Sequence, residues 1–361
     1  MGITAHWVES HTKGAGWSLA SEVIAFRAIS GPHTGVNLSR YFVCLCERAG
    51  IIMSGSTKVC PMKFSLFSNY STLSCQLFCV TADNTSNNDT ACSAIQNILF
   101  RKHIYSFDSD AQHLPCLAHV VNLAITDFMS AVTNIASVET TSAIWEFDPS
   151  VSMNRIPGDS LDVVSAVRTL AIKIQASGQR ITYFEHLQAE CGITVPLTIP
   201  LHSNVRWGTA DGMLGRAYRL RQPINLFINS ADELFGPITT IWRPGLITKQ
   251  IPWTAFAFKT GDWERVNDIR TIIADANNIQ QYFSHELQPT LWRAIPAFEE
   301  LQTGWETKRD SSRYVLYKGA IDRGLTKIGK YYNKFDEKPV YILALGTFLC
   351  PISFNICLLY I

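Results

Sequence analysis

Charged residues are scarce in this chain of 361 residues. They make up 17% of it, below the roughly 25% of an average soluble domain. Hydrophobic residues make up 47%, which excludes a disordered chain, because disorder needs high charge and few apolar residues. The 31 basic and 30 acidic residues leave a net charge of +1, which excludes a protein that holds nucleic acid through bulk positive charge. Any contact with nucleic acid must therefore come from a local patch.

Several familiar motifs are also absent. The sequence contains no P-loop, no Gly-rich dinucleotide fingerprint, no G-x-S-x-G elbow and no H-E-x-x-H helix, so the common nucleotide-binding, hydrolase and metalloprotease classes have no support. The ten cysteines have no recurring pair spacing, which excludes a disulfide or zinc-ribbon framework and favours a reducing compartment. The first ten residues lack the basic and apolar regions of a signal peptide, so we interpret the four N-x-S/T sequons as chance.

Two segments differ from the rest of the chain. Residues 339–361 carry no charged side chain and are long enough to cross a bilayer, so a tail anchor is one hypothesis. Gly346 and Pro351 interrupt this run, and we expect an apolar tail that does not belong to the fold. Residues 59–77 are rich in Ser, Cys and Phe without a clear period, which indicates an insertion or a mispredicted exon.

The first part of the chain has strand and helix patterns in alternation. Two apolar stretches separated by a polar turn predict a hairpin, and a later short apolar run predicts a strand. Apolar residues at helical spacing predict three helices. The segments are 3–8 and 17–29 (hairpin), 35–50 (helix), 78–82 (strand), about 90–100 (helix), 104–106 (a further strand) and 116–132 (helix).

After residue 155 the strand signals become rare, and helical patterns predict an all-α array. These helices are expected over 160–177, 203–227, 263–285, 289–308 and 312–335. The last of them is basic and amphipathic, with cations at Lys318, Arg323, Lys327, Lys330 and Lys334. Taken together, the patterns predict an α/β first part and a helical second part.

Asp83 is the first candidate for chemistry. It follows the strand expected over 78–82 and precedes a polar loop. A carboxylate at the carboxyl end of a core strand suits a metal ion such as Mg²⁺, which prefers hard oxygen ligands held on a rigid edge. The alternative is structural, because Asp83 and Asn84 could form an Asx-turn that caps the following helix.

Cys116 and His119 form the second candidate. Three positions apart on one expected helix, they could face the same neighbour. Zinc would need two more ligands, and the sequence offers no second pair. The alternative is a buried Cys and a hydrogen-bonded His in the first turn of a core helix.

The third candidate is Arg206 with Trp207, followed by Arg216, Arg219 and Arg221. An aromatic ring beside guanidinium groups suits stacking on an unpaired base and clamping of phosphates. The alternative is a Trp that anchors a helix start in the core.

Three stretches resemble those of a known family in their order, their spacing and their amino-acid sequence. They are TADNTSNNDT at 81–90, PCLAHVVNLAITDF at 115–128 and LHSNVRWGTADGML at 201–214. With GITAHWV at 2–8, they resemble the catalytic core of hAT-superfamily transposases, the zinc-finger-BED and ricesleeper-like group. The resemblance covers nearly the whole chain except the two segments described above, and GITAHWV matches the family's second core strand.

The resemblance implies an RNase H-like mixed sheet, here truncated, interrupted by a large helical insertion. It divides the chain into a partial core (1–135), a mainly helical insertion domain (136–338) and the apolar tail (339–361). It also implies metal-dependent cleavage and joining of DNA by a D-D-E triad that holds Mg²⁺ or Mn²⁺. Transposon-end DNA is the implied partner, together with homo-oligomers of intact relatives, and the nucleus is the implied location.

The same resemblance implies roles for individual residues. Asp83 matches the second acidic residue of the triad and would be a catalytic metal ligand. Cys116 and His119 match the C-x-x-H motif near the active site. Trp207 matches the Trp of the R-W motif, which handles the flanking DNA end, so Arg206, Trp207 and Arg216 are the expected DNA-binding residues.

The chain departs from the family pattern at both outer acids. The first Asp of the family lies on a strand before the Gly2-Ile3-Thr4 stretch. The last Glu belongs to a C-terminal dimerisation region that should follow residue 345, where KPVYILAL gives way to GTFLCPISFNICLLYI. The BED zinc finger is missing too, and Asp108 and Asp110 match no catalytic position. We therefore expect the sheet to lack its first strand, leaving a neighbour with an unpaired edge, and the chain to neither cleave nor join DNA. The alternatives are a domesticated module that binds protein or DNA without chemistry, and a tail-anchored membrane protein.

Overall fold

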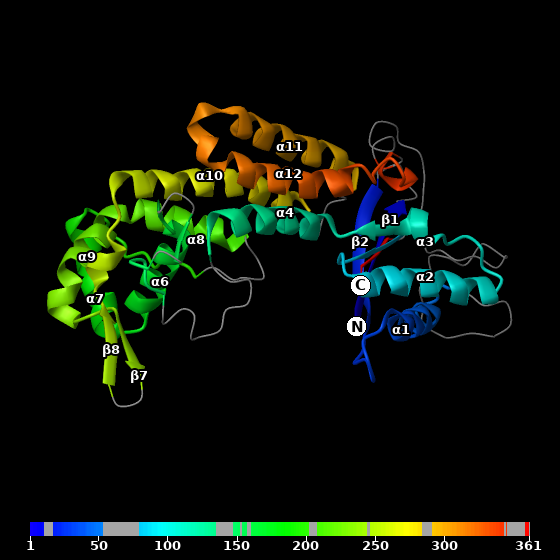
Figure 1. Ribbon diagram of the computed structural model, residues 1–361. Helices are drawn as coiled ribbons and strands as arrows, with labels where there is room; N and C mark the ends of the chain where they lie inside the picture. Colours follow the sequence, from blue (N-terminus) through cyan, green and yellow to red (C-terminus); the bar gives the residue numbers. More distant parts are fainter. Residues whose placement is uncertain are drawn as a thin grey trace. The chain divides into compact units, whose positions relative to one another are not determined.

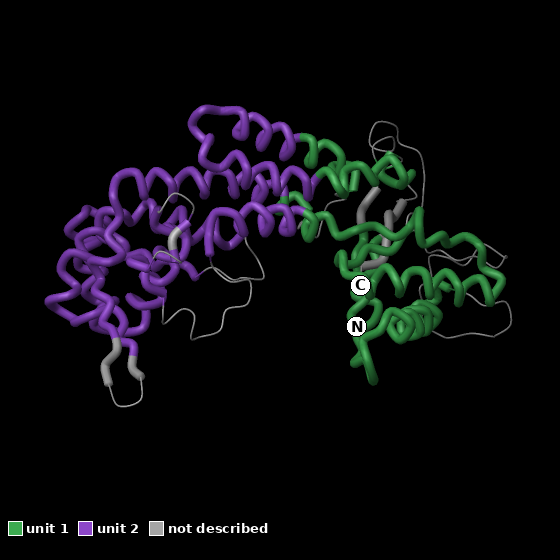
Figure 2. The backbone as a smooth tube through the Cα atoms, in the orientation of Figure 1, with its two compact units in different colours: residues 1–120, 280–299, 329–361 green, residues 121–279, 300–328 purple. Residues whose placement is uncertain are grey.

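The computed structural model describes residues 1–10, 17–52, 79–134, 147–151, 154–156, 160–201, 208–243, 246–283, 291–342, 344 and 358–360. The chain forms two compact units (Figure 2). Unit 1 consists of residues 1–120, 280–299 and 329–361, and unit 2 consists of residues 121–279 and 300–328. The described part is mixed α/β and mostly helical, which confirms the expected class with its large helical portion. The suspected insertion at 59–77 lies outside the described residues.

Unit 1 contains a five-stranded sheet with both parallel and antiparallel pairs (Figure 1). Its strands are β1 (Gly2–Ser10), β2 (Trp17–Phe26), β3 (Cys79–Ala82), β4 (His113–Pro115) and β9 (Leu358–Tyr360). They lie in the order β2-β1-β9-β3-β4. The β1–β2 and β1–β9 pairs are antiparallel, whereas the β9–β3 and β3–β4 pairs are parallel. The expected hairpin at the start of the chain is confirmed.

The central place in this sheet belongs to β9, from the apolar tail. Tyr360 pairs with Thr4 on one side and with Thr81 on the other. The expectation that this tail stays outside the fold is therefore wrong for Leu358–Tyr360. Because β9 pairs with both β1 and β3, neither of these strands has an open edge at the centre of the sheet. The physical reason is that main-chain N–H and C=O groups between two strands need partners on both sides, and an uncharged strand from a distant part of the chain meets that need.

Two helices of unit 1 pack against each other, α1 (Gly35–Arg48) and α2 (Ser86–Arg101). A Cβ atom at Gly35 would lie 2.6 Å from the main-chain nitrogen of Ala91, so the absence of a side chain at residue 35 allows this close approach. The core of the unit joins both helices to the sheet through apolar residues that are almost fully buried. It includes Ile3, Phe42, Val80, Cys92 and Ile95.

The region between β3 and α4 (Leu117–Val132) differs in part from the expectation. The helix expected over 116–132 is confirmed, but the strand expected at 104–106 is wrong. His103 has φ 60°, so the chain turns there and enters a short helix, α3 (Ser109–Gln112), before the strand β4. A strand of three residues carries too little periodicity to be located from the sequence.

Unit 2 is built mainly from helices, as expected. Its helices are α6 (Val163–Gln175), α7 (Gly178–Glu190), α8 (Gly208–Arg219) and α9 (Arg221–Phe235), together with most of α4, α10 (Thr260–Tyr282), α11 (Ala294–Asp310) and α12 (Lys318–Tyr332). Two of these helices, α8 and α9, take the place of the one expected over 203–227. Two small hairpins, β5 (Arg155–Ile156) with β6 (Ser160–Leu161) and β7 (Thr239–Arg243) with β8 (Leu246–Ile251), accompany them. Helix α7 and the β7–β8 hairpin were not among the elements expected from the sequence.

A buried carboxylate fixes where α6 begins. Asp162 is the N-cap of α6, and its Oδ1 accepts a hydrogen bond from the Ser165 main-chain N–H at 3.0 Å. Its Oδ2 accepts from Thr133 Oγ1 at 2.9 Å and from the Asn134 N–H at 2.7 Å. Burial raises the pKa of Asp162, and these hydrogen bonds act against that rise. One side chain therefore ties the residues after α4 to the start of α6.

Trp305 organises another part of unit 2. The ring is fully buried, and its indole N–H donates to the Ile272 carbonyl at 3.1 Å. Gly324 of α12 lies directly against the ring, because a Cβ at that position would fall on it. The helices α11 and α12 therefore approach closely where one has a large aromatic residue and the other has no side chain.

No helix among the described residues combines the length and apolar character needed to cross a membrane. Most of the apolar tail, at residues 343, 345–357 and 361, lies outside that part. The tail-anchor hypothesis stays an untested prediction for those residues.

We expect Gly324→Ala to lower the free energy of unfolding by about 1–3 kcal/mol, because the added methyl group overfills a packed site. Gly319→Ala is the matched control on the same helix, since a Cβ at Gly319 meets nothing within 4 Å. That control should stabilise the helix by up to about 1 kcal/mol. Urea denaturation followed by circular dichroism measures both, and equal effects of the two substitutions would contradict the close packing.

We expect Leu359→Pro to destabilise the sheet by about 1–3 kcal/mol, because proline has no N–H and would leave a buried carbonyl of a neighbouring strand without its donor. Leu359→Val keeps the N–H and should cost less. The midpoint of urea denaturation is the measurement. A Leu359→Pro variant that unfolds at the same urea concentration as the original chain would show that β9 is not part of the sheet.

Candidate functional site

The candidate site lies at the carboxyl edge of the parallel strands β3 and β4. Asp83 is the first residue after β3, and Cys116 is the first after β4. Because Ala82 and Pro115 are paired in register, the two following residues leave the sheet at the same edge. The Cys116 N–H donates to the Ala82 carbonyl at 2.9 Å. The structure therefore brings together two of the residues that the sequence analysis singled out.

Asp83 is exposed, and its carboxylate organises the polar loop that follows β3. Its Oδ1 accepts a hydrogen bond from Thr85 Oγ1 at 3.0 Å and another from the Asn88 side-chain amide. The Asn88 Nδ2 also donates to the Asp83 carbonyl at 3.1 Å. These bonds hold the start of α2 against the end of β3. Within the described part of the chain, Oδ2 makes no hydrogen bond.

Cys116 lies at the N-terminal end of α4, and its thiol caps that end. The sulfur accepts hydrogen bonds from the main-chain N–H groups of Ala118 and His119. Burial nevertheless raises the pKa of the Cys116 thiol, and the nearby charge of Asp83 raises it further. The His119 side chain is half-buried on the same turn. At neutral pH this geometry holds Cys116 as a neutral thiol.

A second group of titratable residues lies in unit 1 and was not identified from the sequence. The His113 Nδ1 atom is 3.4 Å from the Asp89 carboxylate, while its Nε2 atom is buried without a hydrogen-bond partner among the described residues. Burial lowers the pKa of His113, and the Asp89 charge partly offsets this. The Lys338 ammonium donates to the Asp110 carbonyl, and burial lowers the pKa of Lys338. The sequence did not identify His113 as a site residue, because it precedes Pro115 and lies outside the helix expected over 116–132.

The described residues do not fit the pair of metal ions that the family resemblance implies. They contain no group of three or more His, Cys, Asp or Glu side chains that could hold a metal ion. Asp108, near Asp83 in the sequence, caps α3 instead, because its Oδ1 accepts from the Asp110 N–H at 2.9 Å. A single carboxylate can neither neutralise nor position two divalent ions.

The expected DNA-binding residues are only partly described. Arg206 and Trp207 lie outside the described residues. Arg216 belongs to α8 in unit 2, and its guanidinium donates to the Thr198 carbonyl at 2.8 Å. Asp83, Cys116 and His119 belong to unit 1.

We expect Cys116 to react more slowly with iodoacetamide at pH 8 than Cys44, which is exposed. Cys79 and Cys92 should react more slowly still, because burial raises the pKa of each thiol to about 12. At pH 8 only about one in ten thousand of such thiols is ionised, and the thiolate is the reactive form. Peptide mass spectrometry of the native chain gives the order, and the chain in urea is the control. A Cys116 that reacts as fast as Cys44 would contradict the capped, neutral thiol.

Two comparisons with known proteins bear on this geometry. No model of a known protein family matches the chain. The chain is similar to a protein of Talaromyces stipitatus named "Putative transcriptional regulator tpeD", with 20% identity over 354 residues. The alignment covers 97% of this chain and 34% of that protein, so the chain spans about a third of the length of its relative.

Proposed function

We propose that this chain is the RNase H-like core and helical insertion of a protein of hAT-transposase descent, and that it binds DNA in the nucleus without cutting it. The observation that carries the proposal is the strand order β2-β1-β9-β3-β4. The resemblance makes β1 the second core strand and puts the second acid, Asp83, after β3. RNase H-like sheets are built around a central strand, and the place between β1 and β3 is central here, with β9 antiparallel to β1 and parallel to β3.

DNA as the partner has two further supports. The relative from Talaromyces stipitatus is named "Putative transcriptional regulator tpeD", and regulation of transcription is compatible with binding to DNA. In unit 1, Lys330 and Lys334 are exposed, four positions apart, and make no ion pair among the described residues. Lys330 lies in the last turn of α12 and Lys334 in the turn that follows it, and each can neutralise a phosphate.

The absence of cutting in this proposal rests on the site around Asp83. Its carboxylate already holds Thr85 and Asn88, and no second and third carboxylate join it among the described residues. Binding through phosphates needs no metal site, so the two parts of the proposal are compatible.

A protein-interaction module is the second candidate function. The observation that favours it is the pair Val315 and Leu316, whose side chains are 68% and 59% exposed next to each other. Two neighbouring apolar side chains make a small patch, and single exposed apolar residues are normal on protein surfaces. We therefore prefer DNA binding.

We expect the purified chain to bind a fluorescein-labelled 30-base-pair duplex at low salt with a Kd on the order of 1–100 µM, weakening as salt rises. Replacing Lys330 and Lys334 by Gln should reduce the slope of log K against log salt by about two, one for each phosphate contact. Replacing the exposed Arg40 and Arg101 by Gln removes the same charge elsewhere in unit 1 and is the control. Fluorescence anisotropy is the measurement, and no binding at 50 mM salt would contradict the proposal.

The same preparation tests the absence of cutting. We expect supercoiled plasmid to stay intact with the original chain and with Asp83→Ala, in Mg²⁺ or in Mn²⁺. Nicking by the original chain that Asp83→Ala abolishes would show a working metal site and overturn this part of the proposal.

A further inference from the structure

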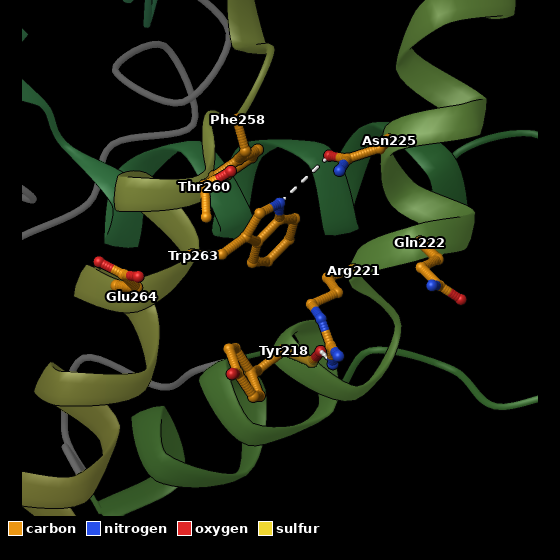
Figure 3. Close-up of a pocket in the computed structure, with 8 residues that line it drawn as sticks. All are labelled: Tyr218, Arg221, Gln222, Asn225, Phe258, Thr260, Trp263 and Glu264. Atoms are coloured by element: carbon orange, nitrogen blue, oxygen red, sulfur yellow. Dashed lines mark hydrogen bonds between the residues drawn. The ribbon is translucent and has the colours of Figure 1, made fainter.

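A pocket of about 320 Å³ opens in unit 2 between the corner that joins α8 to α9 and the start of α10 (Figure 3). Its lining is aromatic and polar, and comes from Tyr218, Arg221, Gln222, Asn225, Phe258 and Trp263, with Glu264 and Thr260 beside them. The volume is near the lower end of the roughly 300–1,000 Å³ usual for ligand pockets. A pocket of this size suits one flat ring with its substituents and not a longer segment of a polymer.

One wall of the pocket is a stacked pair of side chains. The Arg221 guanidinium carbon lies 4.8 Å from the centre of the Tyr218 ring, and its Nη1 donates to the Tyr218 carbonyl at 3.0 Å. These two contacts hold the guanidinium in one place although the Arg221 side chain is exposed. A planar guanidinium fixed in this way offers a face for stacking and N–H donors for a phosphate.

The back of the pocket is formed by Trp263, which is buried and stacks on Phe258 with the ring centres 4.4 Å apart and the planes at 23°. The Trp263 indole N–H donates to Asn225 Oδ1 at 3.2 Å, as Figure 3 shows. Among the described residues the Asn225 amide nitrogen makes no hydrogen bond, so it can donate to a ligand. The exposed Gln222 side chain adds a second amide, with one donor and one acceptor group.

We propose that this pocket takes one unpaired base of single-stranded DNA. The base stacks on the Tyr218–Arg221 wall with Trp263 at the back of the pocket, its polar edge meets the amides of Asn225 and Gln222, and its phosphate meets Arg221. Side-chain amides pair with base edges because both carry donors and acceptors in one plane, and aromatic and guanidinium faces accept any base. The inference rests on the proposed DNA binding and names the form of DNA that this part of unit 2 recognises.

The charges around the pocket favour a nucleotide over an uncharged or cationic ligand. Arg221 is exposed on the α8–α9 side, and Lys259 is exposed between Phe258 and Thr260. Glu264 is the one acidic residue that lines the pocket. Arg221 and Lys259 against the Glu264 carboxylate leave a net positive charge, which attracts a phosphate and disfavours the quaternary ammonium groups that other aromatic pockets hold.

The test compares the affinities of the full chain for fluorescein-labelled (dT)20 and for a 20-base-pair duplex, by anisotropy at 50 mM salt. Tyr218→Leu removes the ring but keeps apolar volume, and Arg221→Gln removes the guanidinium. We expect each to weaken (dT)20 binding about fivefold or more, the loss of about 1 kcal/mol or more per stacked base, and to change duplex binding less than twofold. Arg219→Gln is the matched control, because it removes the same charge two positions away and Arg219 does not line the pocket. It should change both affinities less than twofold.

The results separate the two proposals, DNA binding by the chain and base binding by the pocket. If the original chain binds neither DNA, the proposed function fails. If it binds DNA but the pocket variants bind (dT)20 as well as Arg219→Gln does, the pocket inference alone fails. If Arg221→Gln weakens duplex and single-strand binding equally, Arg221 contacts phosphates only and the pocket takes no base. Gln222→Ala, at an exposed position, replaces Tyr218→Leu if that variant does not fold, and it should weaken (dT)20 binding alone.

Discussion

A strand inside a sheet needs main-chain hydrogen-bond partners along both of its sides, and unit 1 depends on this requirement being met at β9. Three residues, Leu358–Tyr360, connect the β1–β2 hairpin to the parallel pair β3–β4. The core between the sheet and the helices α1 and α2 draws residues from both halves, such as Ile3 and Val80. Without a strand in the centre, these residues would have no common surface to pack on.

The candidate site depends on the same arrangement. Asp83 and Cys116 come together only because β3 and β4 run parallel in register, and β9 extends that parallel set by one strand. The loop after β3 then uses the Asp83 carboxylate to hold Thr85 and Asn88. A carboxylate in this position can hold the start of a helix or bind a cation. Asp83 Oδ1 accepts hydrogen bonds from Thr85 and Asn88, and so holds the start of α2.

Much of the fold could be predicted from the sequence, because periodicity reports local structure. The spacing of apolar residues, together with glycine and polar residues at the ends of the elements, predicts the helices α1 and α4, the hairpin at the start and the strand before Asp83. The place of β9 could not be predicted, since an uncharged apolar run is compatible with a buried strand, a helix or a membrane span. Its partners lie more than two hundred residues away, and local patterns contain no information about such pairing. The pocket was missed for a similar reason, because Tyr218 and Trp263 meet only through the packing of helices that are separate in the sequence.

The position of β9 also has a consequence for synthesis of the chain. Thr4 pairs with Tyr360, so β1 must wait for 356 further residues to be synthesised before its second neighbour exists. At about 5–20 residues per second, this interval is on the order of 20–70 seconds. During that time the inner edge of the hairpin is open to other chains, and contacts this distant in sequence form slowly. The helices of unit 2, whose contacts are more local, have the opportunity to form before the sheet of unit 1 is complete.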